Sequence, residues 1–253
     1  MTSTIKPATD RRRHERFPLL FGLASGPVAT LRSKGGAVFP VINWSYGGLQ
    51  IAVVGNGDSE FAASGGKETG HPVITGILHL ALASKLTQAV QFNVIATSAN
   101  TISCAFVHDT PDALLFLRPW MECLRRGTAM TELAPDVIKP ELASAGWQVW
   151  RGDGPLTLSI QAVKAAFLDW CLVFQVGEGY GEVGATGGKI FSRKSVDNDG
   201  RASSRMQASG ANDPVLLNMA VMHCIGAGSA VPPALCIAII DQLRKDPCLN
   251  PSF

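Results

Sequence analysis

The chain has few charged residues, and this scarcity excludes several classes of protein. Of its 253 residues, 17% are charged and 46% are hydrophobic, so it can bury a large core and is not intrinsically disordered. Its 22 basic and 20 acidic residues give a net charge of +2, which lacks the chain-wide positive field of a nucleic-acid-binding protein. The length is that of one large or two ordinary domains, and we expect two.

Long apolar runs and closely spaced cysteines are also missing. The longest apolar stretch, 72–83, contains His79 and is too short for a helix that spans a membrane. The six cysteines lie far apart, without a C-x-x-C pair or histidines at zinc-ligand spacing. The first residues, MTSTIKPATDRRRHER, are polar and basic, unlike a secretory signal. We therefore expect a cytoplasmic protein with no metal site and no membrane insertion.

Short β-prone segments separated by Gly, Ser and Pro occupy the first half of the chain. Their spacing of about 8–12 residues is typical of antiparallel strands, and their number predicts an all-β barrel of six or seven strands. The predicted strands are 19–24, 28–32, 37–44, 48–54, 73–83, 90–96 and 102–107. A helix follows, which Pro111 begins and Gly127 ends.

The second half predicts an α+β domain with a small antiparallel sheet and two helices. Its predicted strands are 147–151, 156–162, 168–176 and 189–192. Asp213 and Pro214 begin the first helix, which Gly226 ends, and Pro232 and Pro233 begin the second. Both helices are apolar around their circumference, so they are buried in this domain or against a second copy of the chain.

These patterns divide the chain into four parts. We expect a basic arm at 1–17, the barrel at 18–127, a linker at 128–146, and an output or dimerisation domain at 147–253. The linker contains Pro135 and Pro140, which interrupt any helix there.

Two short motifs carry the functional argument. The first is R-x-x-x-R, formed by Arg12 and Arg16, and the second is N-x-S-x-x-G, formed by Asn43, Ser45 and Gly48. An arginine guanidinium donates two hydrogen bonds to the O6/N7 edge of guanine, stacks on the base and pairs with phosphate. Two arginines on one arm therefore suit a ligand with two guanines and two phosphates.

The second motif supplies a wall opposite the arm. If Ile42 and Trp44 fill the barrel interior, Asn43 and Ser45 point outward, because alternate residues of a strand face opposite sides. Gly47 and Gly48 then let the backbone turn sharply and a flat ligand come close.

In these motifs and their β context, residues 10–127 resemble the PilZ family of bacterial cyclic di-GMP receptors. The resemblance implies that Arg12, Arg16, Asn43, Ser45 and Gly48 bind cyclic di-GMP, with Arg11, Arg13 and Gly47 in secondary positions. Many members have Asp where this chain has Asn43, so the amide lacks the negative charge that best accepts guanine N–H groups.

The implied function is that of a non-enzymatic, cytoplasmic bacterial second-messenger receptor. It would relay cyclic di-GMP to an unidentified protein partner, with motility, exopolysaccharide (biofilm) or virulence as the output. The C-terminal domain would contact that partner or form a homodimer.

Several alternatives stay open. The barrel could be a PilZ-like adaptor that binds protein without nucleotide, or the arm a solvated tail or nucleic-acid contact. The C-terminal half could be an enzyme, although the sequence offers no convergent acid/base, nucleophile or metal set. Gly179, Gly181 and Gly184 match the dinucleotide motif G-x-G-x-x-G, but no helical pattern follows, so we expect a β-hairpin turn.

Overall fold

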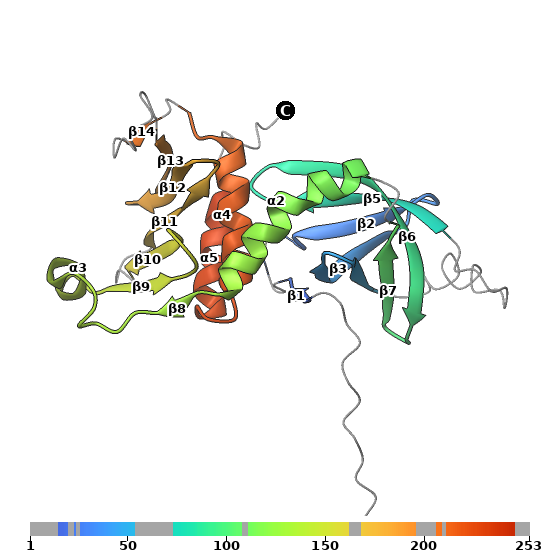
Figure 1. Ribbon diagram of the computed structural model, residues 1–253, viewed down its shortest axis with the longest axis horizontal. Coiled ribbons are helices and arrows are strands. Elements are labelled where there is room, and N and C mark those ends of the chain that lie inside the picture. The colour runs from blue at the N-terminus through green and yellow to red at the C-terminus, as the bar shows by residue number, and fades with distance from the viewer. Residues whose placement is uncertain are drawn as a thin grey trace, which may run out of the picture.

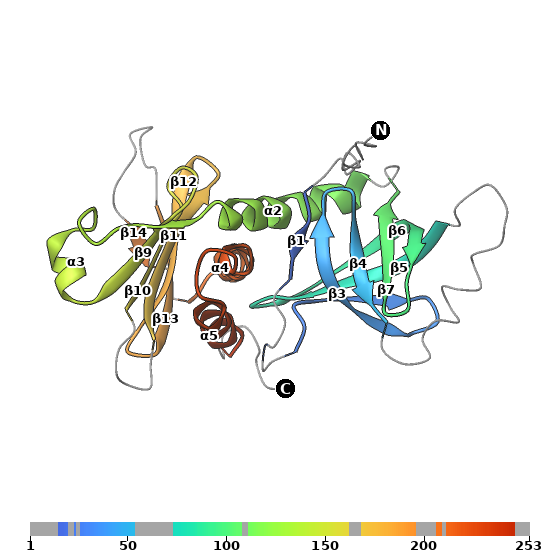
Figure 2. The same ribbon diagram turned by 90° about the horizontal axis from the view of Figure 1, so that it is seen from below.

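Two β-sheets with three long helices between and beside them make up the fold. The computed structural model describes residues 15–19, 23, 26–53, 73–107, 111–161, 168–195, 206–208 and 211–245. The first sheet and the second sheet lie at opposite ends of the molecule, and α4 and α5 lie between them (Figures 1 and 2). An all-β part followed by an α+β part confirms the fold class that the sequence predicts.

The first sheet closes into a barrel. Its strands are β1 (Phe17–Pro18), β2 (Ala29–Ser33), β3 (Val38–Ser45), β4 (Gly48–Ala52), β5 (Val73–Ala81), β6 (Lys85–Thr97) and β7 (Thr101–Phe106). The strand order is β1-β3-β2-β5-β6-β7-β4, and pairing of β3 with β4 closes a six-stranded antiparallel ring. The strand predicted at 19–24 lies mostly outside the described residues.

Strand β3 has three partners because it is longer than β2. Val38 and Phe39 pair with β2, whereas Trp44 pairs with Phe17 of β1 on the part of β3 that β2 does not reach. Strand β4 pairs with Ser45 and its neighbours. The end of β3 that carries the second motif therefore lies between the hairpin strand β4 and the segment that follows the basic arm.

The second sheet is larger than the sequence predicts. Seven strands form an antiparallel meander in the order β14-β13-β12-β11-β10-β9-β8. They are β8 (Thr131–Glu132), β9 (Trp147–Arg151), β10 (Thr157–Gln161), β11 (Asp169–Val176), β12 (Gly179–Thr186), β13 (Lys189–Ser195) and β14 (Met206–Ala208). Strand β8 and the short helix α3 (Pro140–Ser144) lie within the predicted linker.

The G-x-G-x-x-G segment forms strand β12, whereas the sequence predicted a hairpin turn there. The turn itself precedes it at 177–178. Glycines occupy β12 because neighbouring atoms leave no room: a Cβ on Gly181 would lie 3.0 Å from Leu216 Cδ2, and one on Gly184 would lie 2.5 Å from the Trp170 carbonyl oxygen. A strand follows the segment, so no helix N-terminus is available for a pyrophosphate.

Two helix ends lie within one residue of their predicted places, but the glycines that predicted them have another role. Helix α2 (Pro111–Thr128) continues through Gly127, and α4 (Pro214–Ala227) continues through Gly226. A Cβ on Gly127 would meet the His223 carbonyl oxygen and, at 2.9 Å, the Cα of Gly226. These glycines allow the backbones of α2 and α4 to cross in contact; they do not end the helices.

The other helix boundaries follow the predicted signals. Asp213 caps α4, and its carboxylate accepts a hydrogen bond from the Val215 N–H at 2.8 Å. Helix α5 (Pro233–Arg244) begins at the predicted prolines.

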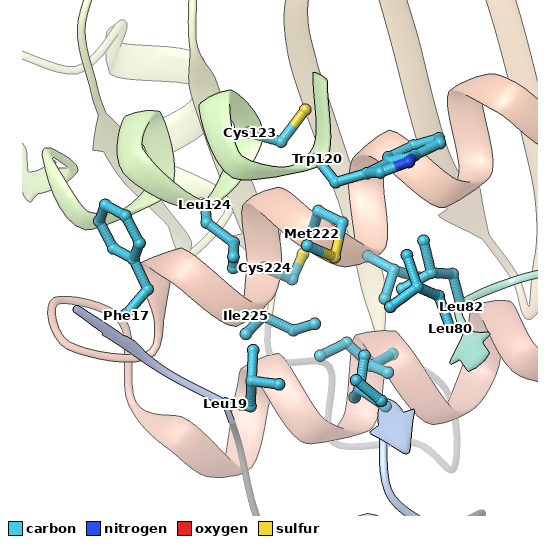
Figure 3. Packing of buried hydrophobic residues seen from close by; sticks show 14 of the residues in the cluster. Phe17, Leu19, Leu80, Leu82, Trp120, Cys123, Leu124, Met222, Cys224 and Ile225 are labelled. Atoms are coloured by element: carbon cyan, nitrogen blue, oxygen red, sulfur yellow. The ribbon is translucent and has the colours of Figure 1, made fainter. Parts of the chain in front are cut away.

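The apolar circumference of α4 is buried within the chain. Leu124 of α2, Ile225 of α4 and Leu80 of β5 belong to one cluster of buried side chains (Figure 3). This cluster continues into both sheets, to Phe92 in the barrel and Leu172 in the second sheet. The helices therefore join the two sheets through a shared core. Among the described helices, none is long and apolar enough to cross a membrane.

Candidate ligand-binding site

The second motif forms the hairpin that joins β3 to β4. The Ser45 hydroxyl donates a 3.1 Å hydrogen bond to the Gly48 carbonyl and closes the turn, and Ser45 is only 8% exposed. Gly48 pairs with Ala105 of β7, and a Cβ at this position would overlap the Cys104 carbonyl oxygen. Glycine at this position is therefore required by strand packing, apart from any contact with a ligand.

A β-bulge changes which side chains of β3 fill the barrel. The sequence predicts Ile42 and Trp44 in the interior, but Val41 is 2% exposed and Trp44 is 1% exposed, while Ile42 is half-buried. The register shifts between Val41 and Asn43, so β3 has one more residue than β4 over this stretch. The prediction for Ile42 is wrong because an extra residue interrupts the two-residue alternation.

Asn43 begins a hydrogen-bonded chain across three strands. Its side-chain amide donates to Gln50 Oε1, and Gln50 Nε2 donates to Thr101 Oγ1 at 3.0 Å. Asn43 itself is half-buried. Among the described residues, no donor contacts Asn43 Oδ1, so this oxygen is available to accept a hydrogen bond. The motif alone does not reveal Gln50, although its place opposite Asn43 follows from the hairpin register.

The end of the basic arm reaches the same hairpin. Phe17 pairs with Trp44 and Pro18 with Asn43, in antiparallel register. Arg16, the residue that precedes Phe17, is exposed. The hairpin brings together Asn43, Ser45, Gly47 and Gly48, and the pairing of Phe17 with Trp44 brings the chain next to Arg16 to the same hairpin. The predicted residues Arg11, Arg12 and Arg13 lie outside the described part of the chain.

Tyr46, at the tip of the hairpin, connects this site to α2. Its hydroxyl donates to Glu122 Oε2 at 3.2 Å, and Glu122 also accepts hydrogen bonds from Arg125 and Arg126 at 2.8–3.0 Å. The hydrogen bond from Arg125 lowers the pKa of Glu122 to about 2. Burial, followed by the charge of Glu122, raises the pKa of Tyr46. The spacing of Glu122, Arg125 and Arg126 on a helix could have indicated the ion pairs, but not Tyr46.

Comparison with known proteins does not assign a family. No protein-family model matches the chain, and a search of curated proteins found no match. Within the described residues, no three His, Cys, Asp or Glu side chains are grouped closely enough to hold a metal ion. The hairpin and the basic arm are therefore the features of the chain that bear on its function.

Proposed function

We propose that the chain is a PilZ-like cyclic di-GMP receptor whose ligand binds between the basic arm and the β3–β4 hairpin. The observation that carries this proposal is the pairing of β1 with β3, in which Phe17 lies opposite Trp44 and Pro18 opposite Asn43. This register brings Arg16 to the same end of β3 as Asn43 and Ser45. This nearness of the segment after the first motif to the second motif supports a site that uses both.

Each side chain has a role that its chemistry supports. The Arg16 guanidinium donates to the O6/N7 edge of one guanine, while Asn43 Oδ1 accepts from guanine N–H groups. Arg12 supplies the second guanidinium, for the other guanine or a phosphate. Gly47 presents a backbone without a Cβ atom against which a flat base can lie, whereas the corresponding side of Gly48 faces the Cys104 carbonyl of β7.

The response to the ligand would pass from the hairpin to α2. Binding brings the arm against the ligand, next to the hairpin. Tyr46 carries the change to Glu122 of α2, through the hydrogen bond described above. Helix α2 also contacts α4 at Gly127 and Gly226, so a change in α2 reaches the C-terminal part that would contact a protein partner.

Calorimetric titration of the full chain with cyclic di-GMP tests the proposal. Arg16→Ala is expected to weaken binding at least tenfold, because a lost charge-assisted contact costs about 2–5 kcal/mol. Asn43→Asp is expected to bind more tightly, because a carboxylate is the stronger acceptor of guanine N–H groups. Arg32→Ala is the matched control, since Arg32 is also exposed on the barrel but lies on β2. Equal binding by the parent and the Arg16 variant would overturn the site.

A second candidate is a barrel that binds a protein partner and no nucleotide. It is favoured by the internal contacts of the motif, since Asn43 and Ser45 already bond to Gln50 and Gly48. Through these contacts the motif would stabilise the hairpin even when no ligand is bound. The same titration separates the two candidates, because the adaptor gives no binding heat with cyclic di-GMP.

A further inference from the structure

The outer face of the barrel carries a patch that is both apolar and basic. Arg32 of β2 lies opposite Val38 of β3 on one side and opposite Ile77 of β5 on the other. All three side chains point outward, because a neighbour of each along its strand, such as Leu31, is buried in the barrel interior. Val38 is 56% exposed and Ile77 is 43% exposed. We call these three residues, together with the exposed Lys34 of the following turn, the outer patch.

A cavity of about 570 Å³ opens at this patch. Its walls are residues 32–36, which end β2 and form the turn to β3, and residues 75–77 of β5. Hydrogen bonds fix the turn: the Ser33 N–H donates to the Ala37 carbonyl at 2.8 Å, and the Ala37 N–H donates to Ser33 Oγ at 3.1 Å. The wall is therefore formed before anything binds, and binding does not have to order it.

The charges around the cavity have one sign. Residues 26–53 and 73–107 contain no Asp or Glu. The ion pairs of the described part of the chain lie on α2 and the second sheet, so no acidic side chain there pairs with Arg32 or Lys34. A molecule that covers the outer patch must therefore bring negative charge for the two cations and apolar surface for Val38 and Ile77.

The outer patch lies apart from the other features of the molecule. Gly26, before β2, contacts Arg244 of α5, and Ser84, after β5, contacts Asn218 of α4. The outer patch is at the opposite ends of these two strands, so α4, α5 and the second sheet do not cover it (Figure 2). Val38 also lies five residues before Asn43 on β3, about 16 Å away at ~3.3 Å per residue. The outer patch is thus separate from the site proposed for cyclic di-GMP.

We propose that the outer patch binds an acidic segment of another protein. Carboxylates of the segment pair with Arg32 and Lys34, and an apolar side chain enters the cavity beside Ile77. A protein suits the cavity better than a free small molecule, because most of the lining residues are exposed and a small ligand would stay partly in water. A lipid surface suits it less well, because membrane-binding clusters contain about 4–8 basic residues.

The second sheet provides an internal comparison. Arg151 of β9 is also exposed, but its neighbours on the two adjacent strands are Thr131 and Thr157. It offers the same charge without exposed apolar side chains beside it. Arg151 is therefore the matched control for Arg32.

Nuclear magnetic resonance of the full chain, with ¹³C-labelled isoleucine and valine methyl groups and without cyclic di-GMP, tests the proposal. The probe is the capped peptide Glu-Glu-Leu-Glu-Glu, at up to about 5 mM because a short segment binds weakly. It is expected to shift the methyl signals of Ile77 and Val38 but not that of Ile51, which is 0% exposed. Gln-Gln-Leu-Gln-Gln is expected to bind at least tenfold more weakly, because both charge pairs are lost. Glu-Glu-Ala-Glu-Glu is expected to bind at least threefold more weakly, because less apolar surface is buried.

Variants then assign the contacts. Arg32→Ala and Ile77→Thr should each weaken binding of the leucine peptide at least threefold, whereas Arg151→Ala should leave it unchanged. Both substituted side chains are exposed, so these variants should fold. The proposal is wrong if the peptide moves neither signal, or if Arg32→Ala and Arg151→Ala weaken binding equally. It is also wrong if the two signals shift with protein concentration alone, which would mean that a second copy of the chain covers the outer patch, or if only phosphatidylglycerol vesicles move them.

Discussion

At the scale of single residues, the β3–β4 hairpin depends on Ser45 and Gly48. The Ser45 hydroxyl is buried and donates to the Gly48 carbonyl, so Ser45→Ala is expected to lower the free energy of unfolding by about 1 kcal/mol. Gly48→Ala is expected to lower it by about 3 kcal/mol, because the new methyl group overlaps the Cys104 carbonyl oxygen. Urea denaturation of each variant measures both values.

The matched control for Ser45 is Ser144. Its hydroxyl also donates to a carbonyl three residues away, that of Glu141, but Ser144 is exposed. Ser144→Ala should change the free energy of unfolding by less than about 0.5 kcal/mol. An equal effect of the two serine substitutions would mean that burial of the Ser45 hydroxyl contributes nothing.

His223 is a second residue whose chemistry is measurable without a ligand. Burial holds its pKa at about 3 in the folded chain, whereas the unfolded chain binds this proton near pH 6.5. The stabilisation is therefore complete above pH 6.5 and is lost as the pH falls toward 3. We expect the free energy of unfolding to fall by about 2 kcal/mol between pH 7 and pH 5.

One variant assigns this loss to His223. His223→Phe should flatten the stability profile between pH 7 and pH 5, because phenylalanine binds no proton. Glu122, whose pKa is lowered from 4.5 to about 2, loses its stabilising pairs only below this window. A profile that stays steep in His223→Phe would contradict the assignment.

At the scale of elements, local signals in the sequence predict where helices begin and end and which strand residues alternate between the two faces of a sheet. They do not predict where one element packs closely against another. The cap at Asp213 and the prolines before α5 act within one helical turn, so their positions could be predicted. Gly127 and Gly226 could not be assigned, because a glycine that ends a helix and one that contacts a second helix look alike in sequence. The same ambiguity hid β12, whose glycines pack against Leu216 and Trp170.

In the candidate site, too, features set by neighbouring residues could be predicted from the sequence, whereas features set by tertiary contacts could not. The order of the two motifs indicates the hairpin and the arm, and strand pairing brings Phe17 and Pro18, which follow Arg16, to Trp44 and Asn43. The bulge at Ile42 depends on the register between β3 and β4, which the alternation of one strand does not contain. Tyr46 could not be connected to Glu122, because 76 residues separate them.

At the crossing of α2 and α4, we expect glycine-to-alanine substitutions to destabilise the fold, which is the opposite of their usual effect in a helix. Alanine usually stabilises a helix interior relative to glycine by about 1 kcal/mol. Here Gly127→Ala and Gly226→Ala are each expected to lower the free energy of unfolding by at least about 2 kcal/mol, because the methyl group would overlap the backbone of the facing helix. Urea denaturation checks this.

Gly146 serves as the control for these two glycines. It has a φ of +77°, and a Cβ there would meet no atom within 4 Å, so Gly146→Ala adds only backbone strain of about 1–2 kcal/mol. Stabilisation by alanine at Gly127 or Gly226 would show that the helices separate easily.

At the scale of the whole molecule, polar contacts as well as apolar ones connect the two sheets. Asn218 of α4 is 2% exposed; its Oδ1 accepts from the Ser84 N–H at 2.8 Å, and its Nδ2 donates to Ser84 Oγ at 2.7 Å. Arg244 of α5 donates to the Gly26 carbonyl at 2.9 Å. The sequence predicts two domains, and separating them would break these hydrogen bonds and expose apolar side chains of the shared core to water.

We therefore expect the barrel and the second sheet to unfold together, even though the sequence divides the chain near residue 128. Trp44 lies in the barrel and Trp170 in the second sheet, each 1% exposed. In a chain labelled with 5-fluorotryptophan, the ¹⁹F signals of both residues should therefore disappear at the same urea concentration. Asn218→Ala, which leaves the Ser84 N–H without its acceptor, should lower both midpoints equally, by about 1–3 kcal/mol in unfolding free energy. Two separate midpoints would instead mean that the shared core holds two independently stable domains, and a chain ending at Gly127 would then fold alone.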